Sequence, residues 1–226
     1  MKTIPGSYAF RFYGADLVAL PSGALWWPRY QTLCVSDLHL GKAERIARRG
    51  GGLLPPYETQ DTLLILQADI DQCGPGRVIC LGDSFDDLDA VHALSDDHHD
   101  WLMGMQAGRN WIWIEGNHDP GPLNLPGQHM VELRQDDVVF RHIALTEGKG
   151  EISGHYHPKA RLKLGGRTLS RSCFLWDQRR VIMPAFGTYT GGLNCTDAAF
   201  HDLMAVDARA ILTGQSCLVM PMPTSG

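Results

Sequence analysis

The sequence has no excess of positive charge. Its 226 residues include 20 Lys and Arg against 25 Asp and Glu, which gives a formal net charge of −5 and a pI of about 6.0. This balance excludes a uniformly basic coat for nucleic acid, although it leaves room for a local basic patch. Two divalent cations held in one cleft would add a strong positive field there.

Long apolar runs and paired cysteines are also missing. No stretch approaches the ~20 apolar residues of a membrane-spanning helix, and the first residues lack the apolar segment of a secretory signal. The six cysteines are scattered without a Cys-x-x-Cys pair, which disfavours a disulfide framework or a four-cysteine zinc site. We therefore expect a cytoplasmic protein with buried, reduced thiols and no membrane partner.

The chain shows no internal repeat and no linker long enough to divide it, so we expect a single domain over residues 1–226. With 44% hydrophobic residues it has enough apolar side chains for a substantial core. Apolar runs predict strands at residues 32–36, 77–81 and 111–114, and helices at 42–49, 58–71 and 95–107. This β-α-α-β-α-β order predicts an α/β core whose strands are parallel.

The second half is rich in short strands. Apolar runs at residues 130–133, 138–142, 151–153, 173–176 and 203–206 are among those that predict strands. Their short connections favour antiparallel pairing, so we expect a second sheet stacked on the first.

Polar side chains follow the strands at the points where they end. Asp37 and His39 follow the first of these strands, Gly82-Asp83 the next, and Gly116-Asn117-His118-Asp119 the third, while His142 and Gly154-His155-Tyr156-His157 follow later ones. Open α/β sheets bind ligands at the carboxyl ends of their strands. Carboxylate, amide and imidazole groups are ligands for Mn, Fe, Zn and related divalent ions. Glycines before Asp83, Asn117 and His155 would allow a close backbone approach to such a cluster.

In this order the five blocks resemble the signature of the calcineurin-like binuclear metallophosphoesterases. Within that superfamily the chain most resembles the bacterial DNA-ligase-associated endonuclease branch called PdeM. The branch resemblance rests on residues 36–42, on the Arg-rich segment after them, and on Pro184-Ala185-Phe186-Gly187 before Gly191-Gly192. It implies an α/β four-layer sandwich of two stacked mixed β-sheets flanked by α-helices, with the metals at its rim.

The resemblance also implies a ligand set for two divalent metal ions, most simply Mn²⁺, with Fe or Zn as alternatives. One ion would be held by Asp37, His39, Asp83 and His157, and the other by Asp83, Asn117, His142 and His155. His118 would face the substrate as the catalytic histidine, and Asp86 would orient it. The Arg that often follows this Asp in the superfamily is replaced by Asp87.

The branch resemblance implies a Mn-dependent endonuclease that cuts single-stranded DNA in DNA repair, with a ligase or helicase as a possible associate. Two metals neutralise the phosphate and acidify a bridging water, so that hydroxide attacks phosphorus. A phosphatase or phosphodiesterase for small nucleotides is the alternative. A binding scaffold that lost catalysis is disfavoured because every ligand position and His118 are present.

A basic segment follows His39. On the predicted helix, Lys42, Arg45 and Arg49 share one face and Arg48 lies beside them. Our hypothesis is that these side chains replace the lost Arg and contact phosphates at the rim of the metal site; a solvated helix face is the alternative.

Overall fold

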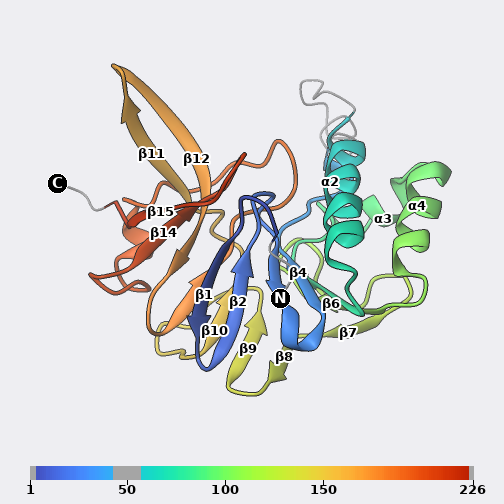
Figure 1. Ribbon diagram of the computed structural model, residues 1–226. Helices are drawn as coiled ribbons and strands as arrows, with labels where there is room; N and C mark the ends of the chain where they lie inside the picture. Colours follow the sequence, from blue (N-terminus) through green and yellow to red (C-terminus); the bar gives the residue numbers. More distant parts are fainter. Residues whose placement is uncertain (1–3, 43–56, 224–226) are drawn as a thin grey trace.

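The computed structural model describes residues 4–42 and 57–223 (Figure 1). Its strands form two sheets that face each other. The first sheet contains, in spatial order, β1 (Tyr8–Phe12), β2 (Ala15–Ala19), β3 (Leu25–Trp27), β4 (Thr32–Val35), β5 (Arg77–Leu81), β6 (Asn110–Ile114) and β7 (Gln128–Met130). Strands β4 to β7 run parallel, as the βα pattern predicts, whereas β1 to β4 form an antiparallel meander.

The second sheet is mixed as well. Its spatial order is β15 (Leu218–Pro221), β14 (Arg209–Leu212), β12 (Arg167–Trp176), β13 (Arg180–Ile182), β10 (Glu151–Ser153), β9 (Val138–Arg141) and β8 (Glu132–Gln135), and β11 (Lys159–Leu164) pairs with β12. Most neighbours are antiparallel, while β10 is parallel to both β9 and β13. Two stacked mixed sheets confirm the predicted α/β sandwich.

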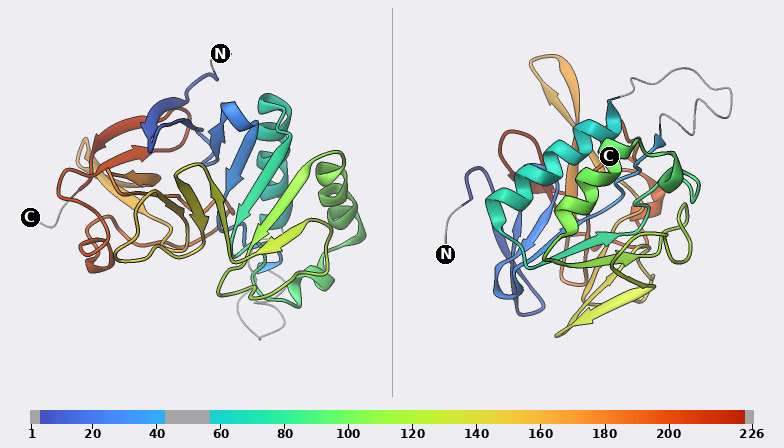
Figure 2. Two further views of the ribbon diagram at one scale, coloured as in Figure 1. Left: turned by 90° about the horizontal axis from the view of Figure 1, so that it is seen from below. Right: turned by 90° about the vertical axis from the view of Figure 1, so that its right-hand side faces the viewer.

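Two helices cover the outer face of the first sheet: α2 (Glu58–Cys73) and α4 (Asp96–Gln106), with the single turn α3 (Ala90–Ala93) beside them (Figure 2). Helix α2 ends where Gly74 adopts φ +60° and donates its N–H to the Ile70 carbonyl. Helix α4 begins at Ser95, whose hydroxyl accepts the His98 N–H. The outer face of the second sheet is covered by the chain around the short 3₁₀ helix η2 (Ala198–Phe200).

Three apolar clusters fill the layers. Leu66 and Leu102 of the helices pack with Val78 of the first sheet, while Ile79 packs with Phe140 and Phe174 between the sheets. On the outer face of the second sheet, Leu175 packs with Phe200 and Leu203. These clusters hold the strands rigidly, so the loops at their ends are carried on a fixed support.

Two predicted strands are wrong. Residues 130–133 are not one strand, because β7 and β8 belong to different sheets and the chain crosses between them at the exposed Val131. Residues 203–206 form turns after η2; Leu203 and Met204 are apolar because they cover the second sheet, and Val206 is exposed. Of the predicted helix at 42–49, only Lys42 lies within the described residues.

Candidate metal centre

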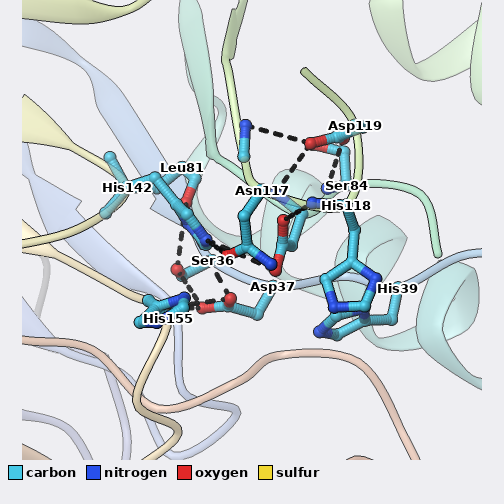
Figure 3. A network of polar contacts seen from close by, with 12 residues as sticks. Ser36, Asp37, His39, Leu81, Ser84, Asn117, His118, Asp119, His142 and His155 are labelled. Carbon is cyan, nitrogen blue, oxygen red and sulfur yellow. Dashed lines mark hydrogen bonds and ion pairs between the residues drawn. The ribbon is translucent and has the colours of Figure 1, made fainter. Parts of the chain in front are cut away.

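The predicted ligand residues meet at one end of the two sheets. Asp37 and His39 follow β4, Asp83 follows β5 and Asn117 follows β6, all in the first sheet. His142 follows β9, and His155 and His157 follow β10, in the second sheet. Figure 3 shows Asp37, Asn117, His142 and His155 turned toward a common centre.

One set of ligand atoms is formed by Asp37, His39 and His157, here called the Asp37 trio. Their ligand atoms all lie within 4.8 Å of one another. The Asp37 Oδ1 atom lies 3.1 Å from His157 Nε2, and the Nε2 atoms of His39 and His157 are 3.4 Å apart. Asp37 and His39 are buried, whereas His157 is partly exposed. Solvent therefore reaches the trio on the side of His157.

A second set is formed by Asp83, His142 and His155, here called the Asp83 trio, again with ligand atoms within 4.8 Å. His142 Nε2 lies 3.3 Å from Asp83 Oδ2 and 3.1 Å from Asn117 Oδ1. The amide of Asn117 therefore lies beside this trio. A cavity of about 360 Å³ adjoins Asn117 and His142.

The imidazoles are held by partners behind them. His142 Nδ1 lies 3.1 Å from the Leu81 carbonyl, and His39 Nδ1 lies 3.0 Å from Asp86 Oδ1. A partner of this kind fixes the ring and leaves Nε2 as the ligand atom, which is typical of metal-binding histidines. His155 Nδ1 is buried with no hydrogen-bond partner among the described residues. An unpaired buried nitrogen is costly unless a ligand satisfies it, so it fits a metal.

The ionisation of Asp37 and Asp83 depends on their contacts with the histidines of the site. Burial raises the pKa of Asp83, but its hydrogen bond to His142 and the charge of that ring outweigh burial and lower the pKa to about 2. Burial likewise raises the pKa of Asp37, but the hydrogen bond to His157 and the charges of His157 and His142 outweigh burial. The pKa of Asp37 is therefore lowered overall. Both carboxylates are therefore ionised at neutral pH, which is the form that binds a metal ion.

Backbone strain is concentrated in the same residues. Nine described residues other than glycine have positive φ, and five of them are predicted ligands: Asp37, His39, Asp83, His155 and His157. Such conformations cost about 1–3 kcal/mol each and are found mostly at functional sites.

The three predicted glycines each allow a close approach. A Cβ atom on Gly82 would strike the His142 ring, one on Gly116 would strike Asp83, and one on Gly154 would strike Ser36 and Asp37. The glycines therefore let the ligand loops pack against one another.

His118 lies beside the ligands. Its backbone N–H donates to Asp83 Oδ1 at 2.8 Å, and its Nδ1 lies 3.1 Å from the Asp86 carbonyl oxygen. His39, Asp86 and His118 form a further group with ligand atoms within 4.8 Å. The Asp86 carboxylate thus also contacts His39, a role that the motif alone did not indicate.

Sequence reasoning assigned no role to Asp119. Its buried carboxylate accepts the backbone N–H groups of Asp83, Ser84, Phe85 and Gly116 at 2.8–3.1 Å (Figure 3). Burial raises its pKa to about 6 in spite of these bonds. Asp119 joins the loops after β5 and β6, and the signal for it was its place beside Asn117 and His118 in one polar block.

Of the predicted basic residues, Lys42 is described: its Nζ donates to the Tyr189 carbonyl at 3.5 Å. Arg45, Arg48 and Arg49 lie outside the described residues.

The donor set matches a divalent metal site. Each trio offers one carboxylate and two imidazoles, with an amide oxygen at the second, and these are donors for manganese, iron or zinc. The His and Asp clusters could therefore hold divalent metal ions. The two-sheet fold and this site fit the resemblance to the calcineurin-like metallophosphoesterases that the motifs indicate.

The chain is similar in structure to a nuclease. Its structure superimposes on the crystal structure of Pseudomonas putida nuclease MPE with a TM-score of 0.74 and 26% sequence identity, over 95% of this chain and 100% of the other. No protein-family model and no curated protein matches the sequence. No helix among the described residues is long and apolar enough to span a membrane.

Proposed function

We propose that this protein is a metal-dependent endonuclease that hydrolyses phosphodiester bonds of single-stranded DNA with two divalent ions, most simply Mn²⁺. The observation that carries this proposal is the pair of trios, which bring six side chains together, with Asn117 and His118 beside them. The similarity to nuclease MPE supports nucleic acid as the substrate class.

The ligand roles follow the two trios. Asp37, His39 and His157 would hold one ion, Asn117, His142 and His155 the other, and Asp83 would bridge them. Such ions supply positive charge that neutralises phosphate oxygens, and they lower the pKa of water so that hydroxide is available near neutral pH. The protein contributes a buried carboxylate pair, Asp37 and Asp83, whose positions are fixed by backbone N–H donors from His155 and His118.

His118 would act on the substrate. The Asp86 carbonyl holds its Nδ1, which leaves Nε2 to stabilise developing charge or to protonate the leaving oxygen. A positioned acid of this kind contributes about 10²–10⁴-fold to the rate. Loss of a ligand residue should cost more than loss of His118, because it would also remove the ion that the residue holds.

The basic segment would grip phosphates on either side of the scissile one through Lys42, Arg45, Arg48 and Arg49. This proposal rests on the sequence, since the three arginines lie outside the described residues. Replacing Arg45 and Arg49 by Ala should weaken DNA cleavage and reduce its salt dependence more than it slows hydrolysis of a small aryl phosphodiester. Equal losses on both substrates would reject it.

On the branch resemblance, we propose that this activity serves DNA repair, with a ligase or helicase as associate. We further propose that residues 1–226 act as one domain. All six cysteines are free, four of them buried, which fits the reducing conditions of the cytoplasm.

Small nucleotides are the alternative substrate. The observation that favours them is the cavity of about 360 Å³ beside Asn117 and His142, a volume within the range of small-molecule sites.

One set of incubations separates the two substrates. The purified protein is incubated with circular single-stranded DNA, linear duplex DNA and bis-p-nitrophenyl phosphate, each with Mn²⁺, Fe²⁺, Zn²⁺ or EDTA. Nicking of the circle, which has no ends, in a metal-dependent reaction is the expected result. Asp83→Asn should abolish it, while Asp202→Asn at an exposed position should not. Ester hydrolysis without nicking would favour the small-nucleotide function.

A further inference from the structure

The hairpin of β11 and β12 projects beyond the second sheet (Figure 1). It begins directly after the metal-ligand loop of His155 and His157. Residues 158–173 contain five Lys and Arg and no Asp or Glu. Arg161 and Arg171 are exposed and have no ion-pair partner among the described residues. An unpaired basic ribbon beside the site is therefore available to an anionic partner.

The two faces of this hairpin differ. Lys159 pairs with Ser172 and Arg161 with Ser170, so these four residues share one face, here called the Arg161 face. On the opposite face, Arg171 pairs with Ala160, which is buried against the outer cluster of the second sheet. Cations alternating with hydroxyl groups, as on the Arg161 face, suit the phosphates of an extended strand.

The Arg161 face is connected to the metal centre. Lys159 Nζ donates to the Thr190 carbonyl at 2.8 Å, and Lys42 Nζ donates to the Tyr189 carbonyl at 3.5 Å. Both carbonyls belong to residues 187–192, here called the Tyr189 loop. The Gly187 N–H donates to the Asp37 carbonyl, and a Cβ on Gly192 would strike the His157 carbonyl. The loop therefore runs between two residues of the Asp37 trio.

Tyr189 is presented outward by a fixed loop. Its side chain is 55% exposed and has no ring contact or hydrogen bond among the described residues, although its φ of 57° is strained for a tyrosine. The neighbouring Thr188 holds the loop to α2, because its N–H donates to Thr62 Oγ1 at 3.0 Å and its hydroxyl donates to the Glu58 carbonyl at 2.8 Å. An exposed aromatic ring on a loop whose carbonyls accept hydrogen bonds from two lysines can stack on a base, as aromatic rings do in proteins that bind single strands.

We infer that Tyr189 and the Arg161 face form the surface that holds the single-stranded nucleic acid on the Asp37 side of the metal centre, with the ring stacking on a base and Lys159 and Arg161 contacting the phosphates that follow. This inference rests on the proposed function for its substrate class. It adds the direction in which the strand leaves the site, along the hairpin. Arg161 and Tyr189 are substrate-binding residues here, and neither touches the reacting atoms.

Binding of a fluorescein-labelled oligothymidylate, followed by anisotropy over a range of salt, tests the surface separately from catalysis. The measurement uses Mn²⁺-loaded protein with His118→Ala, so that the oligonucleotide stays intact. Arg161→Ala should weaken binding about fivefold or more and reduce the slope of log K against log salt by about 0.7, the value for one phosphate contact on a single strand. Tyr189→Ala should weaken binding about fivefold or more without changing that slope, and Tyr189→Phe should restore it.

Arg171→Ala is the matched control, since it removes the same charge from the opposite face of the same hairpin. It should bind within about twofold of the parent, because diffuse surface charge contributes little at physiological salt. Equal weakening by Arg161→Ala and Arg171→Ala, or parental binding by Tyr189→Ala, would overturn the inference. So would a parent protein that binds no oligonucleotide.

Cleavage with His118 intact separates this inference from the proposed function. The ratio of circular-DNA cleavage to bis-p-nitrophenyl phosphate hydrolysis should fall in Arg161→Ala and Tyr189→Ala. If the parent binds the oligonucleotide with the expected variant pattern but nicks no DNA, the surface stands and the endonuclease proposal fails.

Discussion

The carboxylate of Asp86 supports the imidazole of His39, which lies 47 residues earlier in the sequence: Oδ1 of Asp86 and Nδ1 of His39 are 3.0 Å apart. Both side chains are buried. The contact occupies Nδ1, so the other ring nitrogen, Nε2, faces His157 in the Asp37 trio. A carboxylate behind a metal-binding histidine increases the basicity of the ligand atom and fixes its direction.

Asp86→Asn should therefore weaken manganese binding at the Asp37 trio by about 10–100-fold, the usual cost of losing such a partner. Isothermal titration calorimetry of metal-free protein with MnCl₂ measures this directly. Asp89→Asn, three residues further on at an exposed position, is the control and should titrate like wild type. An unchanged affinity in Asp86→Asn would show that the contact does not support a ligand.

Metal addition should stabilise the fold through the Asp83 trio. A ligand present at about 100 times its dissociation constant adds about 2.7 kcal/mol to the free energy of unfolding. Thermal unfolding with EDTA and with excess Mn²⁺ should show this as a rise in Tm, and His142→Ala should reduce the rise. His201→Ala removes an exposed histidine outside the site and should keep the full rise. The same Tm with EDTA and with Mn²⁺ in wild type would contradict metal binding.

Two glycine substitutions should have opposite effects. In Gly154→Ala the new Cβ would strike Ser36 and the Asp37 carboxylate, so the variant should lose metal binding and stability. In Gly104→Ala, within α4, the new Cβ meets nothing within 4 Å, and the helix should gain about 0.5–1 kcal/mol. Urea unfolding and manganese titration of both proteins measure the difference. Wild-type metal affinity in Gly154→Ala would show that the two loops do not need this close packing.

Asp69 of α2 should make stability depend on pH. Burial raises its pKa to about 6, a hydrogen bond to Ser22 offsets this only in part, and its Oδ2 has no partner. The unfolded chain releases this proton near pH 4, whereas the folded protein keeps it until about pH 6. Between these values the folded state binds more protons, so its stability should fall by about 1.4 kcal/mol per pH unit as the pH rises, and then stay level.

Asp69→Asn removes this titration. The variant should equal wild type near pH 4 and exceed it above pH 6, as measured by urea unfolding across the range. Asp71→Asn, exposed on the same helix, should shift the curve by a similar amount at every pH. A parallel offset for Asp69→Asn as well would exclude Asp69 as the source of the pH dependence.

The strands that lead into the ligand loops are predicted more accurately from the sequence than the strands elsewhere in the fold. Strand β5 and strand β10 have the predicted bounds, because each is a short apolar run that ends in a polar motif. The segment at 203–206 misleads because burial against a sheet makes a covering segment as apolar as a strand. The segment at 130–133 misleads because two strands of different sheets follow each other there. Pairing between sheets is a tertiary property, and no local pattern distinguishes β7 from β8.

The candidate site is predictable as a set of residues but not as a geometry. Spacing and residue type indicate Asp37, His39 and His157, and the structure brings these three together. The contact of Asp86 with His39 depends on how two loops pack, and the four N–H bonds of Asp119 join loops that are distant in sequence. Such contacts leave no periodic signal, so only the folded chain reveals them.

Each trio takes side chains from both sheets: Asp37 and Asp83 come from the first, and His157, His142 and His155 from the second. An ion bound in either trio would therefore cross-link the two sheets at the end where the ligand loops meet. Without metal, this end should open locally before the rest of the fold. The backbone amides after β4 and after β10 should then exchange with deuterium together. The bound ions would then also stabilise the packing of the two sheets.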